Sequence, residues 1–187
     1  MTDEATAKRN ILVLTGAQAL GAASPPIIVS LGGIVGQTLS SVPALATLPV
    51  SLYNLGLALG TIPAAMVMRR LGRRTGYLIG ATIGVFSGLV AALGVVGATF
   101  LVFCLGTLMA GFYGAYVQSY RFAAADTASD GFKPRAISWV MIGGLVGGVI
   151  GPQSVYWTRD LTPATPFAAS FLAQGALALL AIVIVSQ

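Results

Sequence analysis

The stretch AMVMRRLGRRTGYLIG, residues 65–80, carries four arginines between two long apolar segments. The flanking segments, 43–68 and 76–96, contain no charged side chain. About 20 mostly apolar residues are enough for a helix to cross a bilayer. The stretch is therefore predicted to join two transmembrane helices, with its arginines in the water on one side of the membrane.

The composition extends this interpretation to the whole chain. Of its 187 residues, 56% are hydrophobic and only 8% are charged, whereas an average soluble domain carries about 25% charged residues. A soluble globular protein of this composition would lack the polar side chains to cover its surface. An intrinsically disordered chain would be poorer in apolar residues. The sequence therefore predicts an integral membrane protein.

Six apolar segments are each long enough to span a bilayer as a helix. Strands of a membrane barrel are about 10 residues long and alternate in polarity, whereas these segments are longer and continuously apolar. We therefore predict an all-α membrane protein, with a cytoplasmic N-terminus over residues 1–10 and a six-helix bundle over residues 11–187. The predicted helices are 11–36, 43–68, 76–96, 99–121, 136–157 and 164–186.

The basic residues test this helix count independently of hydropathy. If the six helices alternate in direction, nine of the ten Lys and Arg residues fall on one side, and Arg159 alone falls on the other. Loops rich in Lys and Arg stay in the cytoplasm, so both termini are predicted to be cytoplasmic. In a bacterium the membrane would be the inner membrane. No cleavable signal peptide is predicted, because the N-terminus is acidic and the first apolar segment is too long.

Glycines and prolines recur in equivalent places. The segment GLALGTIP, residues 56–63, and the segment GGVIGP, residues 147–152, lie in the second and fifth predicted helices. Small residues four apart let membrane helices approach closely, and matching patterns at these positions are expected of two inverted three-helix repeats. Two prolines at 25–26 interrupt the first helix near its midpoint, where each removes a backbone donor.

The arginine-rich stretch resembles the signature loop of the major facilitator superfamily, G-x-x-x-D-R-x-G-R-R. Arg69 stands in place of the family's Asp, and Ala65 in place of its first Gly. In that family the Asp belongs to a charge network that latches two halves together at the cytoplasmic face. The resemblance implies that the matching arginines stabilise this face. Because the family's Asp is replaced, Asp126 or Asp130 is the candidate acidic partner of these arginines instead. The alternative is that the arginines only set the topology. The matching residues are Arg70, Gly72, Arg73 and Arg74.

The fifth helix resembles the G-x-x-x-G-P element of antiporter branches of the family. The resemblance implies close packing and a bend at Gly147, Gly151 and Pro152. In the fourth helix GFYG, residues 111–114, also matches the family, whereas Thr107 replaces the arginine that usually comes four residues earlier. The family has twelve helices in two halves. The resemblance therefore implies the N-terminal half of a transporter, which would pair with a C-terminal half or with a second copy.

The side chains available for a site inside the membrane are neutral. No Asp, Glu, Lys or Arg lies in the middle of a predicted helix, and such residues usually mark ion or proton pathways. Neutral polar residues are therefore the predicted contacts of a small solute in a central cavity. The alternative for each is a hydrogen bond between helices. The candidates are Gln18, Tyr53, Asn54, Tyr113, Tyr116, Gln153 and Gln174.

These features favour secondary active transport of a small solute by alternating access. The alternative is a glycine-rich, self-associating membrane scaffold or a pore without transport coupling. A membrane enzyme is disfavoured, because the chain has no histidine for Ser-His catalysis and no cluster of metal ligands. No cofactor, metal or nucleic acid is predicted as a partner beside the lipid bilayer and the solute.

Overall fold

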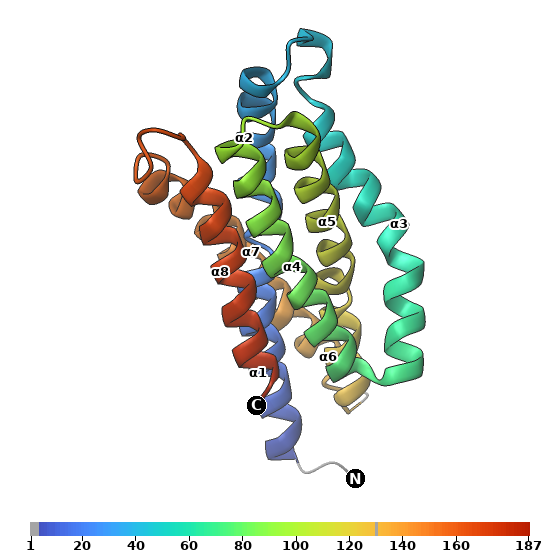
Figure 1. Ribbon diagram of the computed structural model, residues 1–187. Helices are drawn as coiled ribbons and strands as arrows, with labels where there is room; N and C mark the ends of the chain where they lie inside the picture. Colours follow the sequence, from blue (N-terminus) through green and yellow to red (C-terminus); the bar gives the residue numbers. More distant parts are fainter. Residues whose placement is uncertain (1–3, 130) are drawn as a thin grey trace.

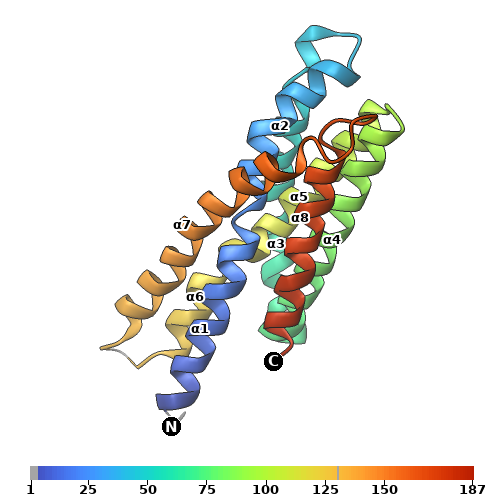
Figure 2. The same ribbon diagram turned by 90° about the vertical axis from the view of Figure 1, so that its left-hand side faces the viewer.

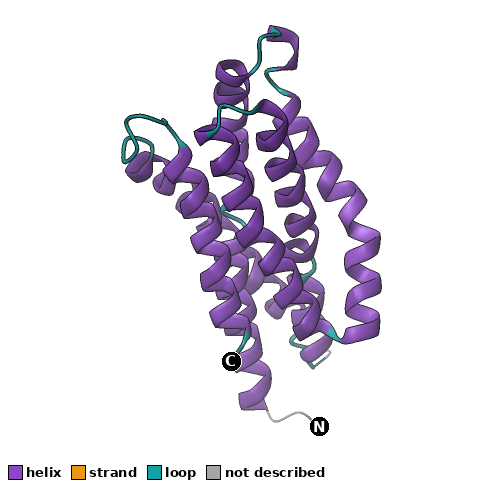
Figure 3. Cartoon of the chain, viewed as in Figure 1, coloured by secondary structure: helices purple, strands orange, loops and turns teal. Residues whose placement is uncertain are grey.

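A computed structural model describes residues 4–129 and 131–187, which form one bundle of helices (Figure 1). No strand occurs in these described residues (Figure 3). The helices are α1 Glu4–Gly21, α2 Ser24–Leu39, α3 Leu48–Leu71, α4 Arg73–Val96, α5 Phe100–Gln118, α6 Tyr120–Thr127, α7 Lys133–Thr158 and α8 Ala168–Val185, with a short 3₁₀ helix η1 at Pro43–Leu45.

Six segments of the described chain are long and apolar enough to cross a membrane. The first contains α1 and α2, and the fourth contains α5 and α6. The predicted all-α membrane fold with six crossings is therefore confirmed. The segments are Arg9–Leu39, Pro43–Leu71, Arg73–Val96, Phe100–Asp126, Lys133–Thr158 and Ala168–Val185.

The first crossing is interrupted where the two prolines were noted. Helix α1 ends at Gly21, and α2 begins at Ser24, immediately before Pro25 and Pro26. A proline has no backbone N–H, so the carbonyls four residues earlier receive no helical hydrogen bond from it. The break therefore leaves polar backbone groups inside an apolar region, where only protein or water can satisfy them.

The fourth crossing is longer than predicted. Its expected end was residue 121, yet after a turn at Ser119 the chain continues as α6 to Thr127. The charged residues Arg121 and Asp126 interrupt the apolar segment, so hydropathy predicts its end there. The alanines between them nevertheless have the highest helix propensity of any residue. Two of these alanines, Ala123 and Ala124, are buried. Helix α6 packs against α1 and α7.

Two groups of helices pack together in the bundle. Helices α3, α5, α4 and α8 form one continuous layer, while α7 lies beside α1 and α2 (Figure 2). Glycines allow α4 to pack closely against α8, and α7 to pack closely against α1. A Cβ at Gly88 on α4 would lie 2.6 Å from the backbone nitrogen of Gly175 on α8. A Cβ at Gly147 on α7 would lie 2.6 Å from the carbonyl oxygen of Ala19 on α1.

The ends and the outer surface of the bundle differ in polarity. The start of α1, the α3–α4 connection and the α6–α7 connection lie at one end, together with nine of the basic residues (Figure 1). Arg159 follows α7 at the opposite end. Large apolar side chains face outward along the sides, and Ile62, Leu101 and Leu145 are each more than 70% exposed. This arrangement suits a bundle surrounded by lipid.

Candidate functional site

The structure divides the seven predicted solute contacts into two groups. Asn54 on α3 and Gln153 on α7 are exposed, and Gln18 on α1 is half-buried. The rest lie inside the helix bundle and do not join the exposed residues in one cluster. The buried group is Tyr53, Tyr113, Tyr116 and Gln174.

Asn54 and Gln153 lie on the two crossings with the smallest buried shares, 22% for the second and 28% for the fifth, whereas Gln18 lies on the first, of which 50% is buried. Asn54 donates a hydrogen bond from its amide nitrogen to the carbonyl oxygen of Val50, 2.9 Å away on its own helix. Gln18 lies beside Gly144 of α7, where a Cβ would be 3.4 Å from the Gln18 amide nitrogen. Of these three amides, Asn54 and Gln153 are exposed on the outside of the bundle, and Gln18 is half-buried.

The buried tyrosines occupy spaces that glycines leave open. A Cβ at Gly84 would lie 2.6 Å from the Tyr113 ring, and one at Gly80 would lie 2.5 Å from the Tyr116 ring. The Tyr53 hydroxyl similarly lies against Gly114, on the helix packed beside it. These rings are thus fixed between helices, where they set the distance between α4, α5 and α3.

Several buried polar atoms inside the bundle are incompletely satisfied. Gln174 donates to the Ser87 hydroxyl at 3.1 Å, and Ser87 donates to the Gly84 carbonyl at 2.8 Å. A buried polar group without a partner costs about 1–3 kcal/mol. A bound solute or a different helix packing that hydrogen-bonds such a group would recover this free energy. Four such atoms have no partner within the described chain: Ser24 Oγ, Tyr113 Oη, Tyr120 Oη and Gln174 Oε1.

The signature-like loop turns sharply at Gly72. This residue has a φ of +84°, a backbone conformation that favours glycine. Beyond it Arg73 forms an ion pair with Asp126 of α6, and Arg74 donates a hydrogen bond to the carbonyl of Ser186 after α8. Asp126 is thus the acidic partner of Arg73, while Asp130 lies outside the described residues.

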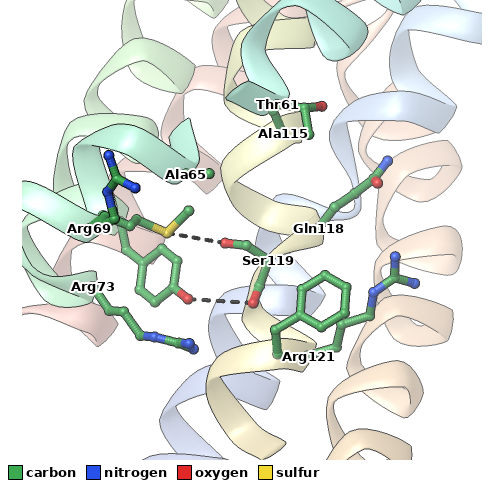
Figure 4. Close-up of a pocket in the computed structure, with 11 residues that line it drawn as sticks. Thr61, Ala65, Arg69, Arg73, Ala115, Gln118, Ser119 and Arg121 are labelled. Atoms are coloured by element: carbon green, nitrogen blue, oxygen red, sulfur yellow. Dashed lines mark hydrogen bonds between the residues drawn. The ribbon is translucent and has the colours of Figure 1, made fainter. Parts of the chain in front are cut away.

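A pocket of about 630 Å³ opens beside this loop, between α3, α4, α5 and α6. Figure 4 shows Arg69 and Arg73 on one side of it, with Gln118 and Arg121 on the other. This pocket was not predicted from the sequence. The sequence feature that could have indicated it is the set of basic residues that separate connections bring to one end of the bundle. The lining residues are Thr61, Ala65, Met68, Arg69, Arg73, Tyr77, Ala115, Gln118, Ser119, Arg121 and Phe122.

Comparison with known proteins shows which family this chain matches. Residues 10–186 match the model of the Major Facilitator Superfamily. The chain belongs to this superfamily. The resemblance noted in the arginine-rich loop and in the fifth helix is therefore confirmed, and the bundle is an integral, multi-pass membrane protein.

Three relatives show how much of such a protein this chain represents. It is 64% identical over 182 residues to the riboflavin transporter RfnT of Brucella anthropi, covering 97% of this chain and 46% of that protein. It is 30% and 27% identical to the uncharacterised MFS-type transporters YdeG and YddS of Bacillus subtilis, covering 79% of this chain and 34% of each. The chain spans less than half the length of these relatives, so it represents one half of the superfamily fold.

Proposed function

We propose that this chain forms the N-terminal half of a secondary transporter that carries riboflavin across the membrane by alternating access. The observation that carries this proposal is the 64% identity to the riboflavin transporter RfnT over 97% of the chain. A shared solute is the simplest explanation of such close similarity between the two sequences. The bundle would be completed by a C-terminal six-helix half.

The chemistry of the spans supports a solute such as riboflavin. Riboflavin is uncharged at neutral pH, with a planar ring system and a chain of hydroxyl groups. The segments 10–68, 75–120 and 136–158 contain no Asp, Glu, Lys or Arg, so the partners they offer are neutral. Amide side chains can hydrogen-bond both the ring and the hydroxyl groups. We assign this binding role to the amides of Asn54 and Gln153, which are exposed, and of Gln18, which is half-buried.

The arrangement of the helices supports alternating access between two halves. Helices α3 and α7 leave broad faces uncovered, whereas α5 is surrounded. In transporters of repeated architecture, the solute site lies near the middle of the membrane at the interface of the repeats. We propose that the uncovered faces meet the second half, and that the arginine-rich loop stabilises the closed cytoplasmic face.

The self-associating scaffold is less well supported. That alternative depended on glycine-rich faces being free for contacts between molecules. Gly80, Gly84 and Gly88 instead contact side chains or backbone within the bundle, and Gly143, Gly147 and Gly151 contact the first crossing. Most of these glycines are used inside one chain, which supports a bundle that pairs with a different half.

The test is riboflavin uptake by a bacterial strain that neither makes nor imports the vitamin. The chain would be expressed alone, or together with the C-terminal half of RfnT as a separate polypeptide. We expect labelled riboflavin to enter only when both halves are present. Asn54→Ala and Gln153→Ala should lower uptake by roughly tenfold, the effect of about 1.4 kcal/mol.

A matched control separates the solute contact from helix packing. Thr82 is an exposed polar residue of α4 that bonds its own helix, as Asn54 does on α3. Thr82→Ala should leave riboflavin uptake unchanged at equal membrane abundance. If both halves reach the membrane together and no riboflavin accumulates, the riboflavin assignment is wrong.

A further inference from the structure

The first crossing and α7 each contain a position at which proline removes helical hydrogen bonds. Pro25 has no N–H to donate to the carbonyl of Gly21, four residues earlier. Pro26 likewise cannot donate to Ala22. Inside α7, Pro152 interrupts the hydrogen bonding in the same way. Bends in helices occur at such positions, so both crossings contain a point at which they can bend.

These two positions lie against each other. Gly151, which precedes the proline of α7, packs on the break in the first crossing. A Cβ there would lie 2.7 Å from the carbonyl oxygen of Ala23 and 3.0 Å from the Cβ of Pro26. One turn earlier, a Cβ at Gly147 would lie 2.7 Å from the Cβ of Ala22. Helix α7 runs beside both α1 and α2 (Figure 2). Because packed helices leave no free space between them, a bend in one requires a bend in the other.

Two buried hydroxyl groups near the break have no hydrogen bond in this arrangement. Ser24 and Tyr113 are 3% and 1% exposed, and neither hydroxyl has a partner among the residues that the structure describes. The Tyr113 hydroxyl lies beside Gly21, 3.0 Å from the place where a Cβ would be. The carbonyl of Gly21 is the acceptor that Pro25 deprives of its helical donor. A buried donor therefore lies beside the backbone of a residue that can accept a hydrogen bond.

Rotation of the backbone at Gly21 would change both the carbonyl and the helix that follows. The Gly21 carbonyl belongs to the peptide group between α1 and the break. A change in the ψ angle of Gly21 turns this carbonyl and redirects α2 at the same time. Glycine adopts a wider range of backbone angles than any other residue. A bend at this position can therefore bring the carbonyl to the Tyr113 hydroxyl.

A hydrogen bond at the end of α7 favours the arrangement in the structure. The hydroxyl groups of Thr158 and Ser170 lie 2.9 Å apart and join the last turn of α7 to the first turn of α8. Ser170 is fully buried, so a bend of α7 away from α8 would leave its hydroxyl without this partner. Bending therefore exchanges one buried hydrogen bond for another.

We propose that the first crossing and α7 share a hinge, about which α2 and residues 152–158 swing together. The pair Thr158 and Ser170 holds the arrangement in the structure, and the Tyr113 hydroxyl donates to the Gly21 carbonyl in the swung arrangement. The swinging segments open and close one end of the solute path, a role that rests on the proposed alternating access. The contacts that form the hinge lie inside this bundle, so they do not depend on what covers the outer faces of α3 and α7.

The movement can be measured as the distance between two spin labels on the chain in lipid nanodiscs. The labels would be attached to introduced cysteines in a Cys104→Ala background and measured by double electron–electron resonance. Val29 on α2, Leu12 on α1 and Leu179 on α8 are exposed positions. We expect two distance populations for the pair Val29→Cys/Leu179→Cys. The control pair Leu12→Cys/Leu179→Cys should give one population, because α1 lies before the hinge.

Two variants should shift the Val29–Leu179 populations in opposite directions. Tyr113→Phe removes the donor of the swung arrangement, so the swung population should fall about fivefold, as for the loss of one hydrogen bond. Ser170→Ala removes the contact that holds α7, so the swung population should rise by about the same factor. A single, unchanged distance in the parent chain and in both variants would overturn the proposal.

Substitution of the α7 proline tests whether the hinge is shared. Pro152→Ala restores the missing N–H of α7, so it should reduce the swung population although both labels lie on other helices. Pro63→Ala is the matched control, because Pro63 is also exposed inside a helix but lies on α3. This control should leave the populations unchanged. Equal effects of the two substitutions would show that the crossings bend independently, and the shared hinge would be wrong.

The hinge and the riboflavin assignment can fail separately. Every measurement of the hinge is a distance within this chain and needs no solute. An absence of riboflavin uptake would therefore leave the distance populations as evidence for the hinge. A single rigid distance in a chain that still supports riboflavin uptake would overturn the hinge and leave the solute assignment standing.

Discussion

The fourth crossing and the second and fifth crossings use similar residues in different ways. In the most apolar stretch of the fourth, 61% of residues are buried, against 22% in the second and 28% in the fifth. All three contain glycines and neutral polar side chains. In the fourth these residues fill space between neighbours, whereas on the outer helices many of them face outward. A residue type therefore acquires its role from the helix face on which it lies.

This difference is clearest in two glycines. Gly111 of α5 sits against the backbone of α3, and a Cβ there would overlap the Tyr53 carbonyl. Around Gly148 of α7, no atom of the described residues outside its own helical turn lies within 4 Å of the place where a Cβ would lie. The first glycine joins two helices of this bundle, and the second is free for another contact.

Exchange of these glycines should give the largest difference in stability. We expect Gly111→Ala to lower the free energy of unfolding by about 2 kcal/mol or more, because backbone rather than a flexible side chain must move. Gly148→Ala should be neutral or stabilise by up to about 1 kcal/mol, because alanine favours the helix. Unfolding in mixed detergent micelles, followed by circular dichroism, measures both. Equal losses would show that the two helix faces do not differ.

The connection between the outer α3 and the inner α4 should be the next most sensitive point. Gly72 has a φ of +84°, and within the described chain no non-adjacent residue lies within 4 Å of a Cβ there, so alanine is opposed by backbone conformation alone. Gly72→Ala should cost about 1–2 kcal/mol. Gly33→Ala serves as the control, because its site in α2 is equally open but helical. Similar unfolding curves for the two variants would contradict a conformational role of Gly72.

Substitutions of two buried polar residues should change the free energy of unfolding in opposite directions. The Tyr113 hydroxyl is buried and has no partner among the residues that the structure describes, so Tyr113→Phe should raise the unfolding free energy by about 1 kcal/mol. Ser87→Ala should lower it by about 1 kcal/mol, because the amide of Gln174 loses its acceptor. The same unfolding assay compares them. A large loss in Tyr113→Phe would reveal a hydrogen bond that the bundle alone does not show.

The fold was predictable because hydropathy and charge report on it directly. Long uncharged segments had to be helices in a bilayer, and the arginines of the 65–80 stretch lie between the second and third crossings. Prolines 25–26 likewise indicated the break in the first crossing, because the missing N–H groups act locally. Hydropathy did not predict the bounds of α6, since its helix depends on alanines between two charged residues.

The site was less predictable because it depends on how each helix is rotated. Gln153 and Gln174 are both single amides in apolar helices, yet Gln153 is exposed and Gln174 is buried against Ser87. The neighbouring sequence does not predict this difference in burial. It depends on which helices pack against α7 and α8. The basic pocket has the same origin, because Arg69 and Arg121 come from different crossings and meet only after the helices pack.

The smallest expected effect concerns the ion pair that ties α4 to α6. Arg73 and Asp126 have side chains 43% and 64% exposed, and such pairs contribute about 0.2–1 kcal/mol. A double-mutant cycle with Arg73→Gln and Asp126→Asn should therefore give a coupling near the lower end of this range, falling further in about 0.5 M salt. The coupling is measured from unfolding of the four proteins, which cancels the separate effects of each substitution. A coupling above about 2 kcal/mol that salt does not change would contradict this exposure. It would mean that the ion pair is shielded from water, as buried ion pairs are.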